Sequence, residues 1–192
     1  MLVKNWKKEI FTIPNLLSLF RLALIPVYMN IYLNAKGPDD YTLAGLILAV
    51  SCLTDLLDGK IARKFNMITN LGKFLDPLCD KLTQLALIIC LSSRYRALKY
   101  LLPFFLVKEF WQLFAMIGNL KKGKALDGAL MSGKISTTVL FATLVLMVLW
   151  PTMSEHVANV LTVICFIFLL IAFVDYILAY FGKEKKVRDV EV

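Results

Sequence analysis

Asp55-Leu-Leu-Asp58-Gly59-Lys60-Ile61-Ala62-Arg63 is followed, after eight residues, by Gly72-Lys-Phe-Leu-Asp76-Pro-Leu-Cys-Asp80. This stretch places four carboxylates within sequence that is otherwise typical of membrane-embedded segments. An ionisable side chain inside a membrane costs about 2.5–3.5 kcal/mol on insertion scales, and such residues persist mainly where they pair, bind ions or line a wet cavity. Four of them together indicate a functional site.

The spacing of these carboxylates indicates the kind of site. Asp55 and Asp58 are three residues apart and Asp76 and Asp80 are four apart, so each pair occupies one face of its helix. If the two helix ends meet, the four acidic side chains come together and stay ionised only by neutralising hard cations. Oxygen ligands without histidine or thiolate favour Mg²⁺, Mn²⁺ or Ca²⁺ over zinc.

Four further residues of the stretch suit a phosphate-containing ligand. Gly59, Ala62 and Gly72 are small at positions where the backbone or ring of a ligand would approach closely. Arg63 is the cation expected beside a phosphate group.

The stretch resembles, position for position, the signature of the CDP-alcohol phosphotransferases, D-x2-D-G-x2-A-R-x8-G-x3-D-x3-D. Upstream, Ile13-Pro14-Asn15-Leu16-Leu17-Ser18-Leu19-Phe20-Arg21 is similar to the P-N-x-x-[ST]-x-x-R opening of the phosphatidylglycerophosphate and cardiolipin synthase branches of that family. The similarity of motifs covers roughly the first 80 residues, and the remainder resembles the family only in its hydropathy.

The resemblance implies a role for each motif residue. Asp55, Asp58 and Asp76 would hold two divalent ions, Mg²⁺ or Mn²⁺, and Asp80 would be available as the base or as a further ligand. The CDP pocket would be formed by Asp55, Asp58, Gly59, Ala62, Arg63 and Gly72. The family also implies a homodimer. The alternative, that the carboxylates only mark helix ends and reach toward water, does not suit Asp55, which lies too deep in its span.

Composition predicts an all-α integral membrane protein made of one domain, residues 1–192. The chain is 59% hydrophobic and only 19% charged, whereas soluble domains are about 45–50% apolar. The net charge of +8 comes from short basic clusters that flank the apolar spans. Contact with anionic lipid explains these clusters better than nucleic acid does.

Six transmembrane helices are predicted, preceded by an interfacial amphipathic helix within residues 1–12 and followed by a charged cytoplasmic tail, residues 182–192. The first apolar run lacks a small-residue cleavage site, so we expect it to remain as the first span. Within the bundle, residues 13–181, the spans cover about 14–33, 41–64, 71–92, 100–120, 130–150 and 157–181. The second and third form a hairpin with the motif at one membrane face.

The loops predict the orientation of this bundle, because cytoplasmic loops carry an excess of lysine and arginine. One side has only Lys36, Arg94, Arg96 and Lys99. The other side has Lys4, Lys7, Lys8, Lys60, Arg63, Lys64, Lys121, Lys122, Lys124, Lys183, Lys185, Lys186 and Arg188. Both termini and the active site should therefore face the cytoplasm, in the plasma or inner membrane.

Polar residues outside the acidic stretch are the candidates for binding the acceptor. Asn15, Ser18 and Arg21 share one face of the first span, where they either form structural hydrogen bonds or contact the nucleotide or acceptor. Lys108 and Lys134 are charges in or near the membrane that would suit an anionic acceptor, unless Lys108 simply pairs with Glu109.

The predicted function is transfer of a phosphatidyl group from CDP-diacylglycerol to an alcohol with release of CMP, and sn-glycerol 3-phosphate is the first choice of acceptor. The R-E-[FI]-x5-R pattern of that branch appears here as Lys108-Glu109-Phe110 with Met116 last, and its G-K-x-K-T appears as Gly133-Lys134-Ile135-Ser136-Thr137. These departures leave cardiolipin synthase, with phosphatidylglycerol as acceptor, as the alternative. An ion-binding carrier would instead predict inverted repeats and interrupted helices, and neither is visible in the sequence.

Overall fold

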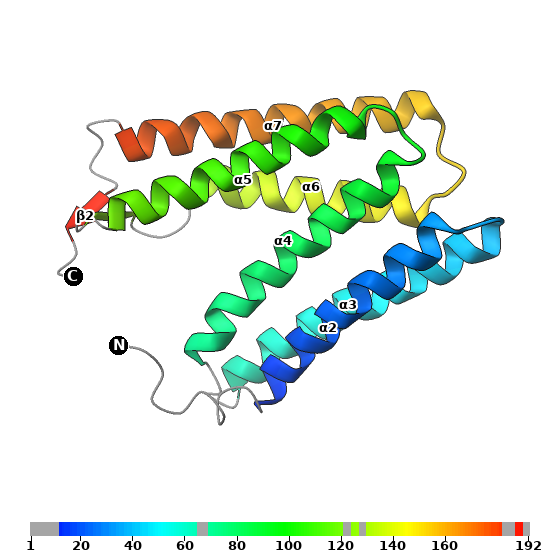
Figure 1. Ribbon diagram of the computed structural model, residues 1–192, viewed down its shortest axis with the longest axis horizontal. Coiled ribbons are helices and arrows are strands. Elements are labelled where there is room, and N and C mark those ends of the chain that lie inside the picture. Colours follow the sequence, from blue (N-terminus) through cyan, green and yellow to red (C-terminus); the bar gives the residue numbers. More distant parts are fainter. Residues whose placement is uncertain (1–11, 65–68, 121–123, 127–129, 182–186, 190–192) are drawn as a thin grey trace. The chain divides into compact units, whose positions relative to one another are not determined.

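Six α-helices make up most of the part of the chain that the structure describes, in a computed structural model covering residues 12–64, 69–120, 124–126, 130–181 and 187–189 (Figure 1). The helices are α2 (Ile13–Leu33), α3 (Pro38–Lys64), α4 (Asn70–Ser92), α5 (Leu98–Leu120), α6 (Met131–Leu149) and α7 (Glu155–Phe181). Two short strands, β1 (Lys124–Leu126) and β2 (Val187–Asp189), accompany them. The chain divides into two compact units.

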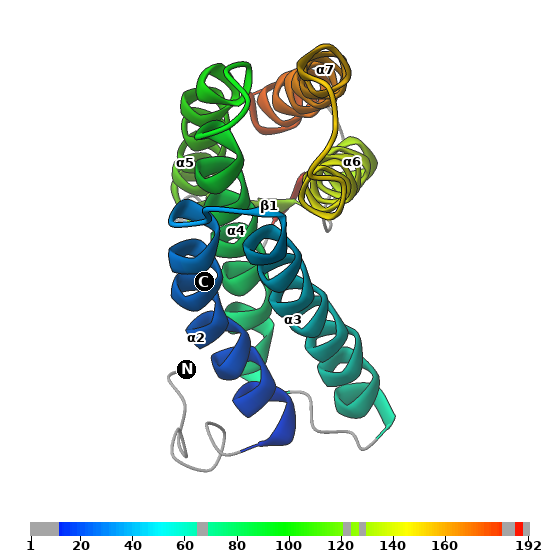
Figure 2. The same cartoon turned by 90° about the vertical axis from the view of Figure 1, so that its right-hand side faces the viewer.

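The first unit, residues 1–93 with 148–151, is built on three helices. Helix α2 packs against both α3 and α4, and α2 and α3 run in opposite directions (Figure 2). Hydrogen bonds join Asn15 to Thr69, Ser18 to Asp76 and Arg21 to Asp80, so α2 and α4 run parallel. The start of α2, the end of α3 and the start of α4 therefore lie at the same end of this unit.

The second unit, residues 94–147 with 152–192, contains the other three helices and the strands. Helix α5 packs on α7 through aromatic contacts, among them Phe104 with Phe166 and Trp111 with Phe173, whose ring centroids lie 4.5 and 5.2 Å apart. Strands β1 and β2 pair antiparallel, with Ala125 opposite Arg188. This pairing joins segments about 60 residues apart, and their charged composition gave no sign of strands.

Four helices among the described residues, α2, α5, α6 and α7, are long and apolar enough to cross a membrane. Helices α3 and α4 have the required length, but the charged residues of the motif interrupt their apolar runs and lower their mean hydropathy. Of the six predicted spans, those formed by α3 and α4 therefore stay predictions. The predicted amphipathic helix, Val3–Phe11, lies outside the described residues.

The predicted bounds differ from the observed ones most at α3. The sequence predicts this helix from about residue 41, whereas the helix begins at Pro38 and has Asp39 and Asp40 in its first turn. Proline suits a first helical position, and carboxylates in the first turn are stabilised by the helix dipole. Asp40 also caps the preceding turn, because its Oδ2 accepts a hydrogen bond from the backbone N–H of Lys36 at 2.8 Å.

Candidate active site

A buried polar face of α2 forms one wall of the site. Asn15, Ser18 and Arg21 are spaced three residues apart and are 1%, 0% and 2% exposed, although α2 is otherwise largely apolar. Each of the three meets a polar partner on or just before α4, at positions 69, 76 and 80. The two faces match because residues three or four apart lie on the same side of a helix. The predicted common face of these α2 residues is thus confirmed.

Arg21 joins the first and last aspartates of the motif. Its Nη2 lies 2.5 Å from Oδ1 of Asp55 on α3, and its Nη1 lies 2.9 Å from Oδ1 of Asp80 on α4. The arginine side chain is only 3% exposed, whereas the side chains of Asp55 and Asp80 are 43% and 50% exposed. Guanidinium is always charged and presents its donors in a fixed fork, so it can bridge two carboxylates. The two ion pairs are therefore buried at Arg21 and exposed at the carboxylates of Asp55 and Asp80.

Ser18 orients the third aspartate. Its hydroxyl donates a hydrogen bond to Oδ1 of Asp76 at 2.8 Å and also lies 3.1 Å from the backbone oxygen of Pro14. Ser18 is completely buried, while Asp76 is half-buried. A hydroxyl hydrogen bond to a carboxylate fixes the direction of the remaining lone pairs. Helix α2 thus holds three motif carboxylates, Asp55 and Asp80 through Arg21 and Asp76 through Ser18.

Asn15 and Thr69 fasten the ends of α2 and α4 together. The side-chain nitrogen of Asn15 donates to Oγ1 of Thr69 at 3.0 Å, and the same oxygen accepts the backbone N–H of Gly72 at 2.9 Å, which caps α4. A Cβ atom at Gly72 would lie 2.7 Å from Oδ1 of Asn15. Glycine is needed here because the amide of Asn15 lies against the α4 backbone. Gly72 therefore has a packing role in addition to the pocket role implied by the motif.

The remaining motif residues, Asp58, Gly59, Ala62 and Arg63, lie on the last two turns of α3. Their side chains fall outside what the structure describes, so their predicted roles stay predictions. Among the residues whose side chains are described, no group of three or more His, Cys, Asp or Glu is arranged to hold a metal ion.

The second unit contains the lysines predicted to bind the acceptor. Lys108 on α5 is 2% exposed, its Nζ lies 2.8 Å from Oε1 of Glu109, and it lies 5.9 Å from the centroid of the Tyr176 ring. The alternative that Lys108 pairs with Glu109 is therefore observed. Lys134 is exposed on the first turn of α6. Ser136, which replaces a family cation, is fully buried and donates to the backbone oxygen of Gly133 at 3.0 Å.

Two residues that pack against the predicted site residues, Thr69 and Tyr176, were not predicted. Thr69 precedes Gly72 by three residues at a helix start, which is the spacing of an N-cap, so the sequence contained a signal for it. The second is Tyr176, whose hydroxyl would lie 2.6 Å from a Cβ atom at Gly133. The sequence contained no local signal for this contact between α6 and α7.

Comparison with known proteins agrees with the motif and the geometry. A membrane protein that gathers acidic side chains of two helices around a buried arginine belongs to the class of membrane proteins with a polar site among their helices. Residues 11–171 match the family model described as CDP-alcohol phosphatidyltransferase. The chain therefore belongs to the CDP-alcohol phosphatidyltransferase family, as its motif predicted.

Relatives with two different names are similar to the chain. It is 38% identical over 116 residues to a cardiolipin synthase (CMP-forming) of Streptomyces coelicolor, covering 59% of this chain and 54% of that protein. It is 37% identical over 111 residues to a CDP-diacylglycerol--glycerol-3-phosphate 3-phosphatidyltransferase of Bacillus subtilis, covering 52% and 58%. An Escherichia coli protein of the latter name is 36% identical over 93 residues, covering 48% and 50%. The chain thus spans about half the length of these relatives.

The carboxylates of the site are the type of donor that suits the divalent metal on which this family generally depends, although the described side chains are not arranged around a metal position. Asp55 and Asp80 offer carboxylate oxygens from two helices and already share one cation, Arg21, while both side chains stay about half exposed. Carboxylate oxygens are the donors that Mg²⁺ and Mn²⁺ prefer. Asp55, Asp76 and Asp80 are the described residues that could contribute to such a site.

Proposed function

We propose that this protein transfers a phosphatidyl group from CDP-diacylglycerol to an alcohol and releases CMP. The observation that carries the proposal is the arrangement of Asp55, Asp76 and Asp80 around the polar face of α2, in the half of the first unit where α2 and α4 begin and α3 ends. The site suits a substrate that has a charged diphosphate and an apolar tail, because charged groups and membrane-exposed apolar surface adjoin one another there. Membership of the family and the names of the relatives support this assignment.

The reaction is a substitution at phosphorus. The oxygen of the acceptor hydroxyl forms a bond to the phosphorus next to diacylglycerol, and the bond from that phosphorus to the CMP oxygen breaks, so that CMP leaves with the electron pair. Asp80 accepts the hydroxyl proton as a general base. Asp55, Asp58 and Asp76 would hold the divalent ions, with Asp80 as a further ligand if it is not the base, and these ions would supply Lewis-acid withdrawal of charge from the diphosphate.

The other motif residues bind and orient the nucleotide in this proposal. Gly59, Ala62 and Gly72 leave room for the CDP moiety, and Arg63 pairs with phosphate oxygen. Arg21 and Ser18 hold the carboxylates in position from the buried side, as their hydrogen bonds to Asp80 and Asp76 indicate.

The proposed acceptor is sn-glycerol 3-phosphate, with Asn15, Arg21, Lys108 and Lys134 as its candidate contacts. Two observations favour phosphatidylglycerol, and thus cardiolipin synthesis, as the second candidate. Lys108 is already neutralised by Glu109, and Ser136 and Met116 stand where the glycerol-phosphate branch has cations, which leaves less positive charge for a free phosphate monoester. The Streptomyces coelicolor relative has the corresponding name.

In the membrane, we propose six spans with both termini and the active site on the cytoplasmic side, assembled as a homodimer. The basic loops support this orientation. A carrier that uses the carboxylates for transport is less well supported, because none of the six described helices is interrupted within its bounds.

The decisive experiment measures CMP release from CDP-diacylglycerol by the purified protein in detergent, with and without Mg²⁺ and with each acceptor in turn. We expect release that depends on Mg²⁺ and on one acceptor, and that is abolished by Asp55→Ala and Asp76→Ala. CMP release equal to that of the boiled protein for every acceptor would contradict the proposal. A cooperative thermal unfolding transition of the unboiled sample must show in the same experiment that this sample is folded.

A further inference from the structure

Helix α4 has a second polar face beside the one that packs on α2. Pro77, Asp80 and Gln84 are spaced three and four residues apart, so their side chains lie on one side of α4. The neighbouring side contacts α2, where Sγ of Cys79 lies 3.5 Å from the backbone oxygen of Ser18. Pro77, Asp80 and Gln84 therefore form a face of their own, which we call the Asp80 face.

The exposed fraction of the side chains falls along the Asp80 face. Pro77 is exposed, the side chain of Asp80 is 50% exposed, and Gln84 is 2% exposed. Four residues of an α-helix rise about 6 Å, so Gln84 lies one turn beyond Asp80. The face thus leads from an exposed end at Pro77 to a buried end at Gln84, with the proposed base between them.

Gln84 contains a buried hydrogen-bond acceptor that is not used. Its Oε1 has no hydrogen-bond partner among the residues that the structure describes. Two other buried polar side chains of this unit are paired, since Thr83 donates to the backbone oxygen of Cys79 at 2.8 Å and Thr54 donates to that of Ser51 at 2.7 Å. An amide oxygen that is buried without a hydrogen bond is costly and needs an explanation. Because this oxygen only accepts, the matching group is an O–H or N–H donor.

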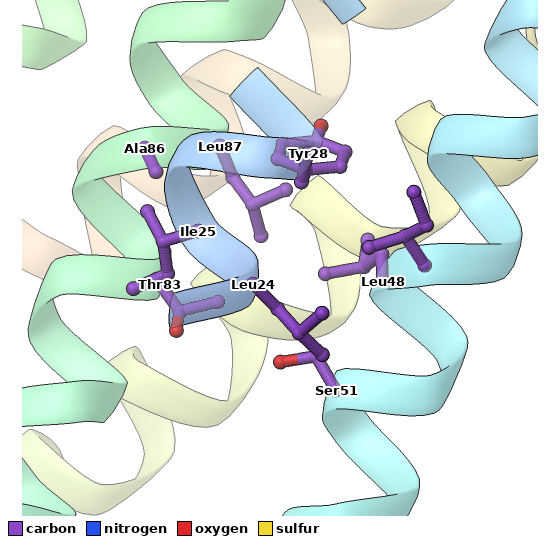
Figure 3. A pocket seen from close by; sticks show the side chains of 9 residues that line it. Leu24, Ile25, Tyr28, Leu48, Ser51, Thr83, Ala86 and Leu87 are labelled. Carbon is purple, nitrogen blue, oxygen red and sulfur yellow. The ribbon is translucent and has the colours of Figure 1, made fainter. Parts of the chain in front are cut away.

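The small cavity in the core of the first unit is separate from Gln84. Its volume is about 10 Å³, which is at the limit for a single water molecule. Figure 3 shows part of its wall, which includes Ser51, Thr83, Leu24, Leu48 and Leu87. Gln84 does not line this cavity, because it lies on a different side of α4 from Thr83. A ligand for Gln84 is therefore sought on the Asp80 face.

The proposed reaction brings a hydroxyl group to Asp80. Both candidate acceptors, sn-glycerol 3-phosphate and phosphatidylglycerol, have a second hydroxyl on the carbon next to the reacting one. Side chains four residues apart on a helix have Cβ atoms about 5–6 Å apart. Asp80 and Gln84 can thus each accept a hydrogen bond from one of two neighbouring hydroxyls, whereas a simple alcohol would leave Oε1 of Gln84 unpaired.

We infer that Oε1 of Gln84 accepts a hydrogen bond from this second hydroxyl and makes the protein specific for acceptors with hydroxyls on neighbouring carbons. The inference rests on the proposed function and adds to it the residue that selects the class of acceptor. Gln84 is a specificity-determining residue, and Asp80 remains the proposed base. Replacing Gln84 should lower the preference for a diol and leave binding of CDP-diacylglycerol unchanged.

The first experiment compares each acceptor with an analogue that lacks the second hydroxyl. The pairs are glycerol 3-phosphate with 3-hydroxypropyl phosphate, and phosphatidylglycerol with phosphatidyl-1,3-propanediol. Gln84→Met keeps an unbranched side chain of similar length but has no amide. Thr83→Val is the matched control, because Thr83 is also buried beside Gln84 but its hydroxyl is bonded within its own helix.

Steady-state CMP release gives kcat/KM for both members of each pair. We expect the unmodified protein and Thr83→Val to prefer the diol over its analogue about tenfold, because the analogue leaves a buried acceptor unpaired. Gln84→Met should use the two about equally, with an unchanged KM for CDP-diacylglycerol. The pair that supports release identifies the source of the diol. A preference as large in Gln84→Met as in the unmodified protein overturns the inference.

Thermal unfolding in detergent separates this role of Gln84 from a structural one. Without acceptor, Gln84→Met should unfold at the same temperature as the unmodified protein or at a higher one, because it removes a buried oxygen that has no partner. The productive acceptor should raise the transition temperature more in the unmodified protein than in Gln84→Met. A variant that unfolds at a lower temperature and loses kcat/KM equally for diol and analogue would show a structural role and overturn the inference.

The unmodified protein separates this inference from the proposed function. If it releases no CMP from CDP-diacylglycerol with any acceptor, the proposed function fails and the inference with it. If it releases CMP in the presence of an acceptor but uses the diol and its analogue equally well, the proposed function stands and the inference alone is wrong.

Discussion

Arg21 and Asp80 are joined by a hydrogen-bonded ion pair of 2.9 Å, although they belong to different helices and are 59 residues apart in the sequence. The same guanidinium also contacts Asp55, so one buried cation holds acidic side chains from two further helices. Removing one partner of a buried ion pair leaves the other charges uncompensated. Because the carboxylates here are about half exposed, water reduces this penalty. Replacing Arg21 therefore tests whether the carboxylates of Asp55 and Asp80 form one cluster.

We expect Arg21→Met to lower the free energy of unfolding by about 2 kcal/mol, the typical value of hydrogen bonds to charged groups. Addition of Mg²⁺ should raise the thermal transition more in this variant than in the unmodified protein, because the metal supplies the missing positive charge. Thermal unfolding in detergent at several Mg²⁺ concentrations measures both effects. Arg96→Met, at an exposed position, is the control and should change neither. Equal Mg²⁺ shifts in all three proteins would contradict a common cluster.

The sequence predicted the common polar face of α2 but not its partners. Asn15, Ser18 and Arg21 are three residues apart, and this spacing alone places them on one side of a helix. Which helix faces them depends on how α2 and α4 pack and on their relative register, which local patterns do not contain. For this reason structural hydrogen bonding of these residues was predicted only as one of two alternatives, and the ion pairs of Arg21 were not predicted.

Non-local contacts also explain the other differences between the sequence predictions and the structure. Gly72 was predicted from its small size to border the nucleotide, whereas the close approach of Asn15 supplies an additional reason for glycine there. The β1–β2 pair joins two charged segments that are far apart in sequence. By contrast, the six helices follow from apolar runs, which charged residues interrupt in α3 and α4, and the family follows from the spacing of the aspartates, since both are local properties of the chain.

The contact of Gly72 with Asn15 leads to a prediction about stability. In Gly72→Ala the new Cβ would lie 2.7 Å from Oδ1 of Asn15 and 3.1 Å from Oγ1 of Thr69, so a buried amide must move. We expect a loss of about 1–3 kcal/mol, as for other overpacked sites. Gly118→Ala on α5, which would meet nothing within 4 Å, is the matched control and should be neutral or slightly stabilising.

A double-mutant cycle shows whether the contact itself is responsible. Unfolding is measured for Gly72→Ala, Asn15→Ala and the double variant. In the double variant the cost of the added methyl group should largely disappear. Strictly additive losses would mean that the glycine is required for a different reason.

Ser18 should influence the metal through Asp76. Ser18→Ala removes the 2.8 Å hydrogen bond to Oδ1 of Asp76 without adding bulk. Loss of a residue that orients a metal ligand commonly weakens metal affinity by about 10–100-fold. Mn²⁺ binding followed by electron paramagnetic resonance measures this directly. Ser18→Thr keeps the hydroxyl and should bind Mn²⁺ more nearly normally, and equal affinity in the alanine variant and the unmodified protein would exclude the proposed orientation.

Lys108 provides a test of the proposed acceptor site. It is 2% exposed and paired with Glu109, so the variant that avoids leaving an uncompensated carboxylate is Lys108→Met with Glu109→Gln. If this lysine contacts the acceptor, KM for glycerol 3-phosphate should rise about tenfold, as expected for a lost charge-assisted hydrogen bond, while KM for CDP-diacylglycerol stays constant. Steady-state kinetics with each substrate varied in turn measure the two values. A parallel rise in both would indicate a structural role.

The variants Asp80→Asn and Asp76→Asn should lose different properties, turnover in the first and Mn²⁺ binding in the second. Asp80→Asn keeps an oxygen for Arg21 but cannot accept the hydroxyl proton, and a positioned base contributes about 10²–10⁴-fold in rate. We therefore expect turnover to fall by that factor while Mn²⁺ and CDP-diacylglycerol binding persist. Asp76→Asn should instead weaken Mn²⁺ binding, because Asp76 is proposed as a ligand that the hydroxyl of Ser18 orients.

Both variants need the same check on folding, because Asp80→Asn also removes one of the two negative partners of the buried Arg21. Thermal unfolding of each variant gives that check, and Mn²⁺ titration beside single-turnover CMP release then separates binding from chemistry. If Asp80→Asn remains folded but loses Mn²⁺ as severely as Asp76→Asn, Asp80 is a metal ligand, and another group must take the proton from the acceptor hydroxyl.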